Sequence, residues 1–210
     1  LSGCNGNRSI FDDSPQPLLH NFSESKLESC LSECAKADRD TIAGDAMLRK
    51  IYRKGGHCYW VNEYGVSPSA DSLISILSEA KDYGLSPKAF LIDSLRNSIN
   101  RINNRLFRAN EDTLKTLAEI EYTLSKSYLR YVTGTHFGFF NPNKVFNNLD
   151  FDRDPKNWSK KRYKRLFDIK TSKADSLFCT EALSKISSPD NLRGYLSALH
   201  PQSKLYSQLK

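Results

Sequence analysis

The sequence predicts an all-α fold, a helical bundle with irregular connectors and at most one short strand or hairpin. Three observations support this prediction. Apolar residues recur every three to four positions through most of the chain, which is the helical period. Ser-Pro pairs and glycines stand where such stretches begin and end. Only residues 57–61 have the aromatic density of a short strand.

The composition is typical of a globular protein that folds in water. The chain has 210 residues, of which 39% are hydrophobic and 11% aromatic, and its mean hydropathy is -0.56. No stretch approaches the roughly 18 apolar residues of a transmembrane helix. We expect one helical domain over residues 26–210, preceded by a flexible N-terminal segment over residues 1–25.

Two helices are predicted in the first half of this domain. The first covers residues 67–83, because Ser67 is a good N-cap, Pro68 suits the first helical position and Gly84 ends the pattern. Its apolar stripe consists of Ala70, Leu73, Ile74, Leu77 and Ala80. The second begins at Ser86-Pro87. Its core-facing residues are Leu91, Leu95, Ile99, Ile102 and Leu106.

The longest helix is predicted to begin after Asn110, to carry Arg130 in its last turn and to end at Gly134. Its stripe consists of Leu114, Leu117, Ile120, Leu124, Tyr128 and Tyr131. Two short helices follow, and they end at Ser188-Pro189 and His200-Pro201. Their apolar residues are Leu177, Phe178, Ala182 and Ile186 in one, and Leu192, Tyr195, Leu196 and Leu199 in the other.

The net charge of +7 favours an anionic partner. Part of the excess is a local run formed by Lys156, Lys160, Lys161, Arg162, Lys164, Arg165 and Lys170. One interpretation is a patch that binds acidic lipid, an anionic cell-wall polymer or nucleic acid, and the other is a solvated surface. Because the chain contains no nucleic-acid recognition motif, we do not expect nucleic acid as a partner.

The first residues, Leu1-Ser2-Gly3-Cys4, resemble the lipobox of a bacterial lipoprotein, whose cysteine receives a lipid after the signal peptide is removed. Residues 5–25 are rich in polar residues, proline and glycine, which is typical of a flexible tether. We therefore expect lipid attachment at Cys4, membrane association through that lipid, and a periplasmic location. The alternative is an ordinary chain terminus with a chance cysteine.

The other cysteines, Cys30, Cys34, Cys58 and Cys179, allow two disulfides in three pairings, or remain as buried thiols. Cys30 and Cys34 are four positions apart on one helix, which makes a direct bond between them awkward. Their spacing to His57 and Cys58 matches no standard zinc site. We therefore expect neither a metal nor a cofactor.

Several segments together resemble a known family. They are Tyr59-Trp60-Val61, the helix from Ser67 to Ala80, Tyr83-Gly84-Leu85-Ser86-Pro87, Tyr128-Leu129-Arg130-Tyr131, Gly138, Asn141-Pro142 and residues 199–209. This pattern is similar to the scaffold domain that precedes the catalytic domain of large bacterial L,D-transpeptidases, over about residues 43–210. The resemblance implies a domain that supports peptidoglycan cross-linking, with peptidoglycan or a neighbouring catalytic domain as its partner.

The sequence lacks the Ser-His-Gly-Cys stretch that supplies the nucleophile in this family. Cys58 directly follows His57, and adjacent side chains on a strand point to opposite faces, so the pair is poorly placed as nucleophile and base. Cys179 lies in an apolar helix and is expected in the core. We therefore expect no catalytic residue in this chain, and no enzyme activity.

The expected binding surface combines aromatic and basic residues, namely Trp60, Tyr64, Phe137, Phe139, Lys160, Lys161, Arg162, Lys164 and Arg165. Aromatic rings at helix junctions stack on sugars or on a neighbouring module. The alternative interpretation is that these rings fill the ends of the bundle.

Three functions follow from the sequence. The first is a non-catalytic scaffold domain of a lipid-anchored, L,D-transpeptidase-like envelope protein. The second is a free-standing periplasmic adaptor that binds peptidoglycan or another envelope protein. The third is a secreted eukaryotic binding protein, because Asn7-Arg8-Ser9, Asn21-Phe22-Ser23 and Asn157-Trp158-Ser159 satisfy the N-glycosylation rule.

Overall fold

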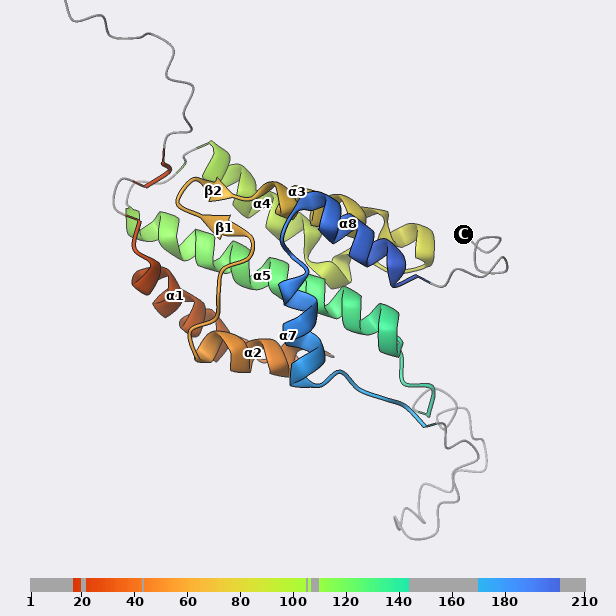
Figure 1. The fold of residues 1–210 in the computed structure, drawn as a ribbon. Helices are drawn as coiled ribbons and strands as arrows, with labels where there is room; N and C mark the ends of the chain where they lie inside the picture. Colours follow the sequence, from red (N-terminus) through yellow and green to blue (C-terminus); the bar gives the residue numbers. More distant parts are fainter. Residues whose placement is uncertain are drawn as a thin grey trace, which may run out of the picture.

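The structure, a computed structural model, describes residues 17–19, 22–42, 44–104, 106, 110–143 and 170–200. It confirms the all-α fold with one short hairpin (Figure 1). In chain order the elements are α1 (Glu24–Ala37), α2 (Asp45–Arg53), β1 (Val61–Asn62), β2 (Gly65–Val66), α3 (Pro68–Ser78), η1 (Glu79–Tyr83), η2 (Pro87–Phe90), α4 (Ile92–Asn103), α5 (Asn110–Phe137), α7 (Ser176–Ser184) and α8 (Pro189–Ala198).

Helix α5 is the central element of the bundle. It spans 28 residues and contacts α1, α2, α3, α4, α7, η2 and β1 (Figure 1). Because neighbours surround α5 from its middle turns onward, polar side chains such as Glu121, Ser125 and Arg130 are buried there together with Leu124 and Tyr128. Buried polar groups are costly unless they are hydrogen-bonded, so each of these polar residues needs a partner on another element.

The helix predicted over residues 67–83 is confirmed. Ser67 stands in extended backbone at the N-cap, and Pro68 occupies the first helical position. The α-helix tightens into η1 after Ser78, and Gly84 ends it with a φ of 73°. That left-handed conformation costs glycine nothing, which explains why a glycine signals the stop.

The helix predicted from Ser86-Pro87 to Leu106 is broken in the structure. The turn η2 ends at Leu91, whose φ of 56° is left-handed, and α4 begins at the next residue. Leu95, Ile99 and Ile102 face the core as predicted, but Leu106 lies beyond the end of α4 and is 65% exposed. The apolar period continues across the break, which is why the sequence pattern does not reveal it.

Helix α5 runs further than predicted, to Phe137, and the glycine that follows its last residue is Gly138, not Gly134. Gly138 has a φ of 95°, and its N–H donates to the carbonyl of Gly134 at 2.8 Å. Gly134 has a different role, because the ring of Phe139 lies where a Cβ at position 134 would be. Arg130 is therefore an interior residue of α5 and does not belong to its last turn.

Helices α7 and α8 are capped by side chains. Asp175 accepts a hydrogen bond from the N–H of Phe178 at 2.8 Å, and Ser188 accepts one from the N–H of Asn191 at 3.2 Å. The predicted stripe of α7 is partly wrong. Leu177 is 65% exposed, and the fully buried residues are Cys179, Ala182 and Leu183.

The strand predicted over residues 57–61 is displaced. Residues 57–60 have no strand pairing, and the hairpin pairs Val61 with Val66 and Asn62 with Gly65. Near the N-terminus, the N–H of Leu18 donates to the carbonyl of Glu63 at 2.9 Å, and Leu19 is buried in the core. Part of the segment expected as a tether therefore packs on the domain.

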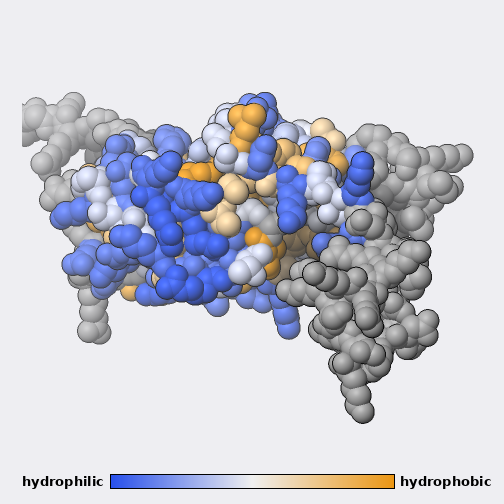
Figure 2. Space-filling view, turned by 90° about the horizontal axis from the view of Figure 1, so that it is seen from below, coloured by the Kyte–Doolittle hydropathy of each residue, from blue (hydrophilic) through white to orange (hydrophobic). Residues whose placement is uncertain are grey.

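The face of the bundle seen from below the view of Figure 1 is largely hydrophilic, with only small apolar areas (Figure 2). In the described part of the chain, no helix combines the length and the apolar composition needed to cross a membrane.

Candidate functional site

A buried carboxylate holds the segment before the hairpin against α5. Glu121 is 0% exposed, and its two oxygens accept hydrogen bonds from the backbone N–H groups of Tyr59 (2.9 Å), Trp60 (2.8 Å) and Val61 (3.1 Å). The hydroxyl of Tyr52 on α2 donates to the same carboxylate at 2.7 Å. One side chain thus satisfies donors from two separate parts of the chain.

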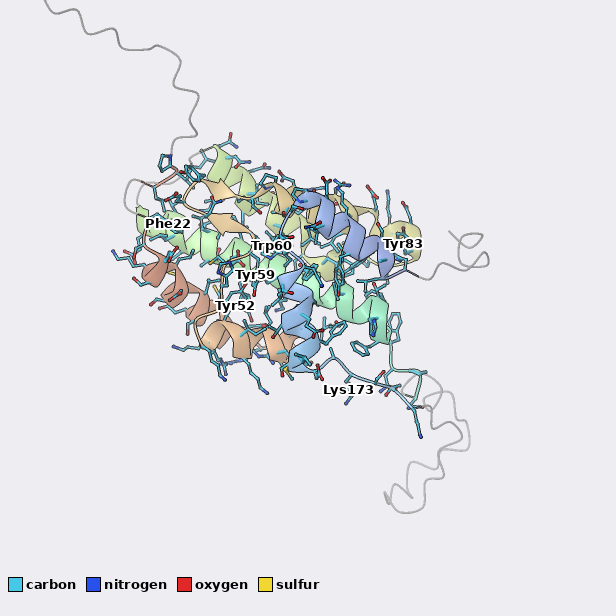
Figure 3. All side chains as sticks on the ribbon, viewed as in Figure 1. Phe22, Tyr52, Tyr59, Trp60, Tyr83 and Lys173 are labelled. Carbon is cyan, nitrogen blue, oxygen red and sulfur yellow. The ribbon has the colours of Figure 1, made fainter. Side chains whose placement is uncertain are left out.

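Ser125, one turn further along α5, extends this arrangement. Its hydroxyl oxygen accepts a hydrogen bond from the indole N–H of Trp60 at 3.0 Å and lies 2.8 Å from the hydroxyl of Tyr52. We call Tyr52, Tyr59, Trp60, Val61, Glu121 and Ser125 the Glu121 cluster. Figure 3 shows Tyr52, Tyr59 and Trp60 close together between α2 and the hairpin. The cluster fixes one wall of the groove described next.

An open groove of about 530 Å³ lies between the start of α1 and the hairpin. It is lined by Phe22, Glu24, Leu27, Glu28, Gly56, His57, Cys58, Tyr59, Val61, Asn62, Glu63, Tyr64 and Ser67. Glu24 and Glu28 are one helical turn apart on α1, so they share a face. Glu63 lies in the turn of the hairpin. The lining of the groove therefore combines carboxylates from α1 and from the hairpin with the aromatic rings of Phe22, Tyr59 and Tyr64.

The groove has an excess of negative charge. Among the described residues, its lining includes no lysine or arginine. The ion pairs between described residues do not involve Glu24, Glu28 or Glu63. Tyr64 is half exposed, and a hydrogen bond to Glu63 raises the pKa of its phenol. Such a site is complementary to a ligand that brings positive charge and hydrogen-bond donors.

The thiol of Cys58 is not activated. Burial raises the pKa of Cys58 to about 12, and the charges of Glu121, Glu28 and Glu24 add to the effect. The strand from which the opposite orientation of His57 and Cys58 was predicted does not form there, and both residues line the groove. The ring of His57 instead packs edge-on against Tyr59, with centroids 5.3 Å apart. A neutral thiol is a poor nucleophile, so this pair does not have the character of a catalytic dyad.

The other described cysteines are also free thiols. Burial raises the pKa of Cys34 and of Cys179 to about 11, and burial also raises the pKa of Cys30. None of the predicted disulfide pairings is formed among the four described cysteines. Among the described residues, no group of three or more acidic, histidine or cysteine side chains is placed to hold a metal ion.

A second polar cluster fixes the connection between α1 and α2. Arg130 contacts Asp45 at 3.0 Å and Asp40 at 2.7 Å. Lys126 contacts Asp40 at 2.8 Å and Asp38 at 2.7 Å, and the hydroxyl of Tyr122 donates to Asp38 at 2.8 Å.

Sequence reasoning missed this second cluster. The available signal was three aspartates within eight positions, opposite a Lys126–Arg130 pair at i,i+4 on one helix face.

The residues of the expected binding surface do not meet in one place. Trp60 is fully buried, with its ring 5.7 Å from that of Tyr128, so it belongs to the core. Tyr64 lines the groove. Phe137 packs against Phe178 at the far end of α5, and Phe139 packs against Phe90. The remaining members of the expected surface, Lys160, Lys161, Arg162, Lys164 and Arg165, and the lipid-attachment residue Cys4, lie outside the described residues.

Comparison with known proteins gives one match. A family model described as a Scaffold domain matches residues 46–210, which include most of α2, the hairpin and every later element. Helix α1 lies outside the matched region. No curated protein and no solved structure matches the chain.

Proposed function

Because the chain belongs to the Scaffold domain family, we propose that it is the non-catalytic scaffold domain of a lipid-anchored, L,D-transpeptidase-like envelope protein. In this role it supports peptidoglycan cross-linking by holding a neighbouring catalytic domain in place. The family match gives the scaffold character. The link to L,D-transpeptidases rests on the sequence resemblance over about residues 43–210.

One combined observation supports the proposal: the polar interior is held together by hydrogen bonds, and the described thiols are not activated. The Glu121 cluster ties α2, the hairpin segment and α5 together through five hydrogen bonds to buried acceptors, each between 2.7 and 3.1 Å. Cys58, the thiol nearest a histidine in sequence, has a pKa of about 12. A domain built in this way presents a fixed surface, and its described thiols lack the character of nucleophiles.

The membrane anchor and the periplasmic location are part of the same proposal, and Cys4 carries them. The test is mass spectrometry of the N-terminal peptide of the protein isolated from the envelope of its native host. We expect Cys4 to be the first residue and to carry a diacylglycerol and an acyl chain. An unmodified Cys4 in the native protein contradicts the anchor.

The supporting role in cross-linking is tested in the host with the full natural gene. We expect Glu121→Gln to lower the fraction of transpeptidase-made cross-links among the muropeptides, although no catalytic residue is changed. Glu119→Gln, an exposed change on the same helix, is the matched control. Normal cross-linking in cells that lack the gene altogether contradicts the proposal.

The groove favours a second candidate, a free-standing adaptor that binds peptidoglycan or another envelope protein. Pull-down with purified sacculi distinguishes the two functions. For the adaptor we expect the chain alone to sediment with sacculi, and we expect replacement of Lys160, Lys161, Arg162, Lys164 and Arg165 by serine to reduce this. A chain that stays in the supernatant contradicts an adaptor that binds peptidoglycan and leaves the scaffold role unaffected.

A further inference from the structure

We propose that the groove between α1 and the hairpin is a binding site for a peptide that carries a primary ammonium group, as a lysine-type side chain does. This inference does not depend on the proposed role at the cell wall, because it rests on the groove alone. Its volume of about 530 Å³ falls within the size range of ligand pockets and accommodates a short peptide segment.

The negative charge of the groove indicates the class of ligand that fits it. Glu24 and Glu28 on α1 and Glu63 on the hairpin are exposed side chains that line the same groove, and no ion pair between described residues neutralises them. These carboxylates are spread along the walls and do not form a metal-binding group within the described chain. An extended organic cation therefore fits better than a metal ion, which needs several oxygens around one point.

The aromatic lining adds a second, independent preference. Phe22, Tyr59 and Tyr64 line the same groove. An ammonium group near an aromatic face is attracted by the ring quadrupole, and the methylene groups of a lysine-type chain pack on the same rings.

A third observation is an unused hydrogen-bonding atom. The hydroxyl oxygen of Ser67 is buried and has no hydrogen-bond partner among the described residues, and Ser67 lines the groove. Asn62, exposed on the hairpin, also lines it. A peptide supplies both amide donors and carbonyl acceptors for these two side chains, whereas a protonated diamine supplies donors only.

The walls are held in place before any ligand arrives. Glu121 binds the N–H groups of residues 59–61, and Leu27 and Leu31 bury α1 in the core. Binding therefore costs little ordering of the protein. Because α1 lies outside the region matched by the family model, Glu24 and Glu28 are contributed by a part of the chain that the match does not cover.

The experiment is an NMR titration of the full chain with acetyl-Ala-Lys-Ala-amide at low ionic strength. We expect amide shifts at residues 57–64, and we expect the affinity to fall when salt is raised. The same peptide with its lysine acetylated is the chemical control, and we expect no binding from it. Equal binding of both peptides overturns the proposal, as does the absence of shifts at residues 57–64.

Two variants and a diamine complete the test. We expect Glu28→Gln and Glu63→Gln each to weaken binding by about fivefold, which is the effect of one exposed charge pair. Glu33→Gln makes the same charge change on α1 outside the groove and should leave the affinity unchanged. Unchanged affinity in both groove variants contradicts the site. Cadaverine that binds as tightly as the peptide contradicts the peptide as the ligand class.

Discussion

The carboxylate of Glu121 accepts a hydrogen bond from the phenol of Tyr52 at 2.7 Å, although 69 positions separate the two residues in the chain. Burial raises the pKa of Glu121 above its ordinary value of 4.5, and hydrogen bonds from Tyr59, Tyr52, Trp60 and Val61 oppose that effect. The carboxylate remains in the core because four donors satisfy it.

Glu121→Gln should destabilise the fold by about 2 to 4 kcal/mol. The amide has only one acceptor oxygen, so its NH₂ group must face backbone N–H or hydroxyl donors that Glu121 now satisfies. The measurement is the free energy of unfolding from urea titration. The exposed Glu119→Gln on the same helix should change it by less than about 0.5 kcal/mol. Equal stability of the two variants contradicts the structural role of the Glu121 cluster.

Asp38 should make the stability of the protein sensitive to acid. Burial alone raises the pKa of Asp38, but hydrogen bonds from Lys126, the amide of Asp40 and Tyr122 outweigh it and lower the pKa to about 2, from its ordinary value of 3.8. Because the folded-state pKa is the lower one, the stabilisation is present above about pH 4 and is lost as the pH falls towards 2.

The stability difference between wild type and Asp38→Asn should therefore be at most about 2 kcal/mol near neutral pH, and it should shrink between about pH 4 and pH 2. Urea titrations over this pH range measure it. Asp82→Asn, an exposed change on η1, is the control and should give a difference that does not vary with pH. A pH-independent difference for Asp38→Asn contradicts the assigned interactions.

At position 91, glycine should give a more stable fold than alanine. Its φ of 56° is left-handed, which costs a non-glycine residue about 1 kcal/mol. Leu91→Gly and Leu91→Ala remove the same side-chain contacts, so their difference isolates the backbone. We expect the glycine variant to melt at the higher temperature. At Asn97, an exposed interior position of α4, the order should reverse and alanine should be better. The same order at both positions contradicts the break at Leu91.

Gly134 and Phe139 should be energetically coupled. A Cβ at position 134 overlaps the ring of Phe139, so Gly134→Ala in the wild type must displace that ring from its place near Phe90. In a Phe139→Ala background the clash is gone, and Gly134→Ala should stabilise α5 by up to about 1 kcal/mol through helix propensity. A double-mutant cycle measures the coupling. Additive effects contradict this packing.

Cys58 should react slowly with iodoacetamide in the native protein, although it lines an open groove. A pKa near 12, instead of the ordinary 9.0, lowers the thiolate fraction about a thousandfold at neutral pH. Peptide-resolved mass spectrometry at about pH 8 compares the native and the urea-unfolded protein. We expect strong protection of Cys58 that is lost on unfolding. Native Cys58 that reacts faster than the same residue in the unfolded chain contradicts an unactivated Cys58 thiol.

Local features of the fold could be predicted from the sequence because their causes lie within a few residues. Ser67-Pro68 marked the start of α3, and Gly84 marked the end of η1, where only glycine adopts a left-handed φ without cost. The period of Leu95, Ile99 and Ile102 identified the buried face of α4. The same local view missed the break at Leu91, because no glycine or proline stands there.

The candidate site could be predicted only in part. The sequence singled out the aromatic segment Tyr59-Trp60-Val61 but left Trp60 open between a binding surface and the interior of the bundle, and the structure buries it. No sequence motif marks Glu24, Glu28 and Glu63 as one site, because Glu24 and Glu28 precede the hairpin by about thirty or more positions. Only the packing of α1 beside the hairpin brings them to one groove.

The sequence by itself determined the all-α class and the limits of α3 and η1. The tertiary structure alone decided which polar side chains of α5 are buried and which partners they find. The physical reason is that caps and apolar periods act between near neighbours. The partners of Glu121 and Arg130, by contrast, lie between 41 and 90 positions away and meet them only when the helices pack.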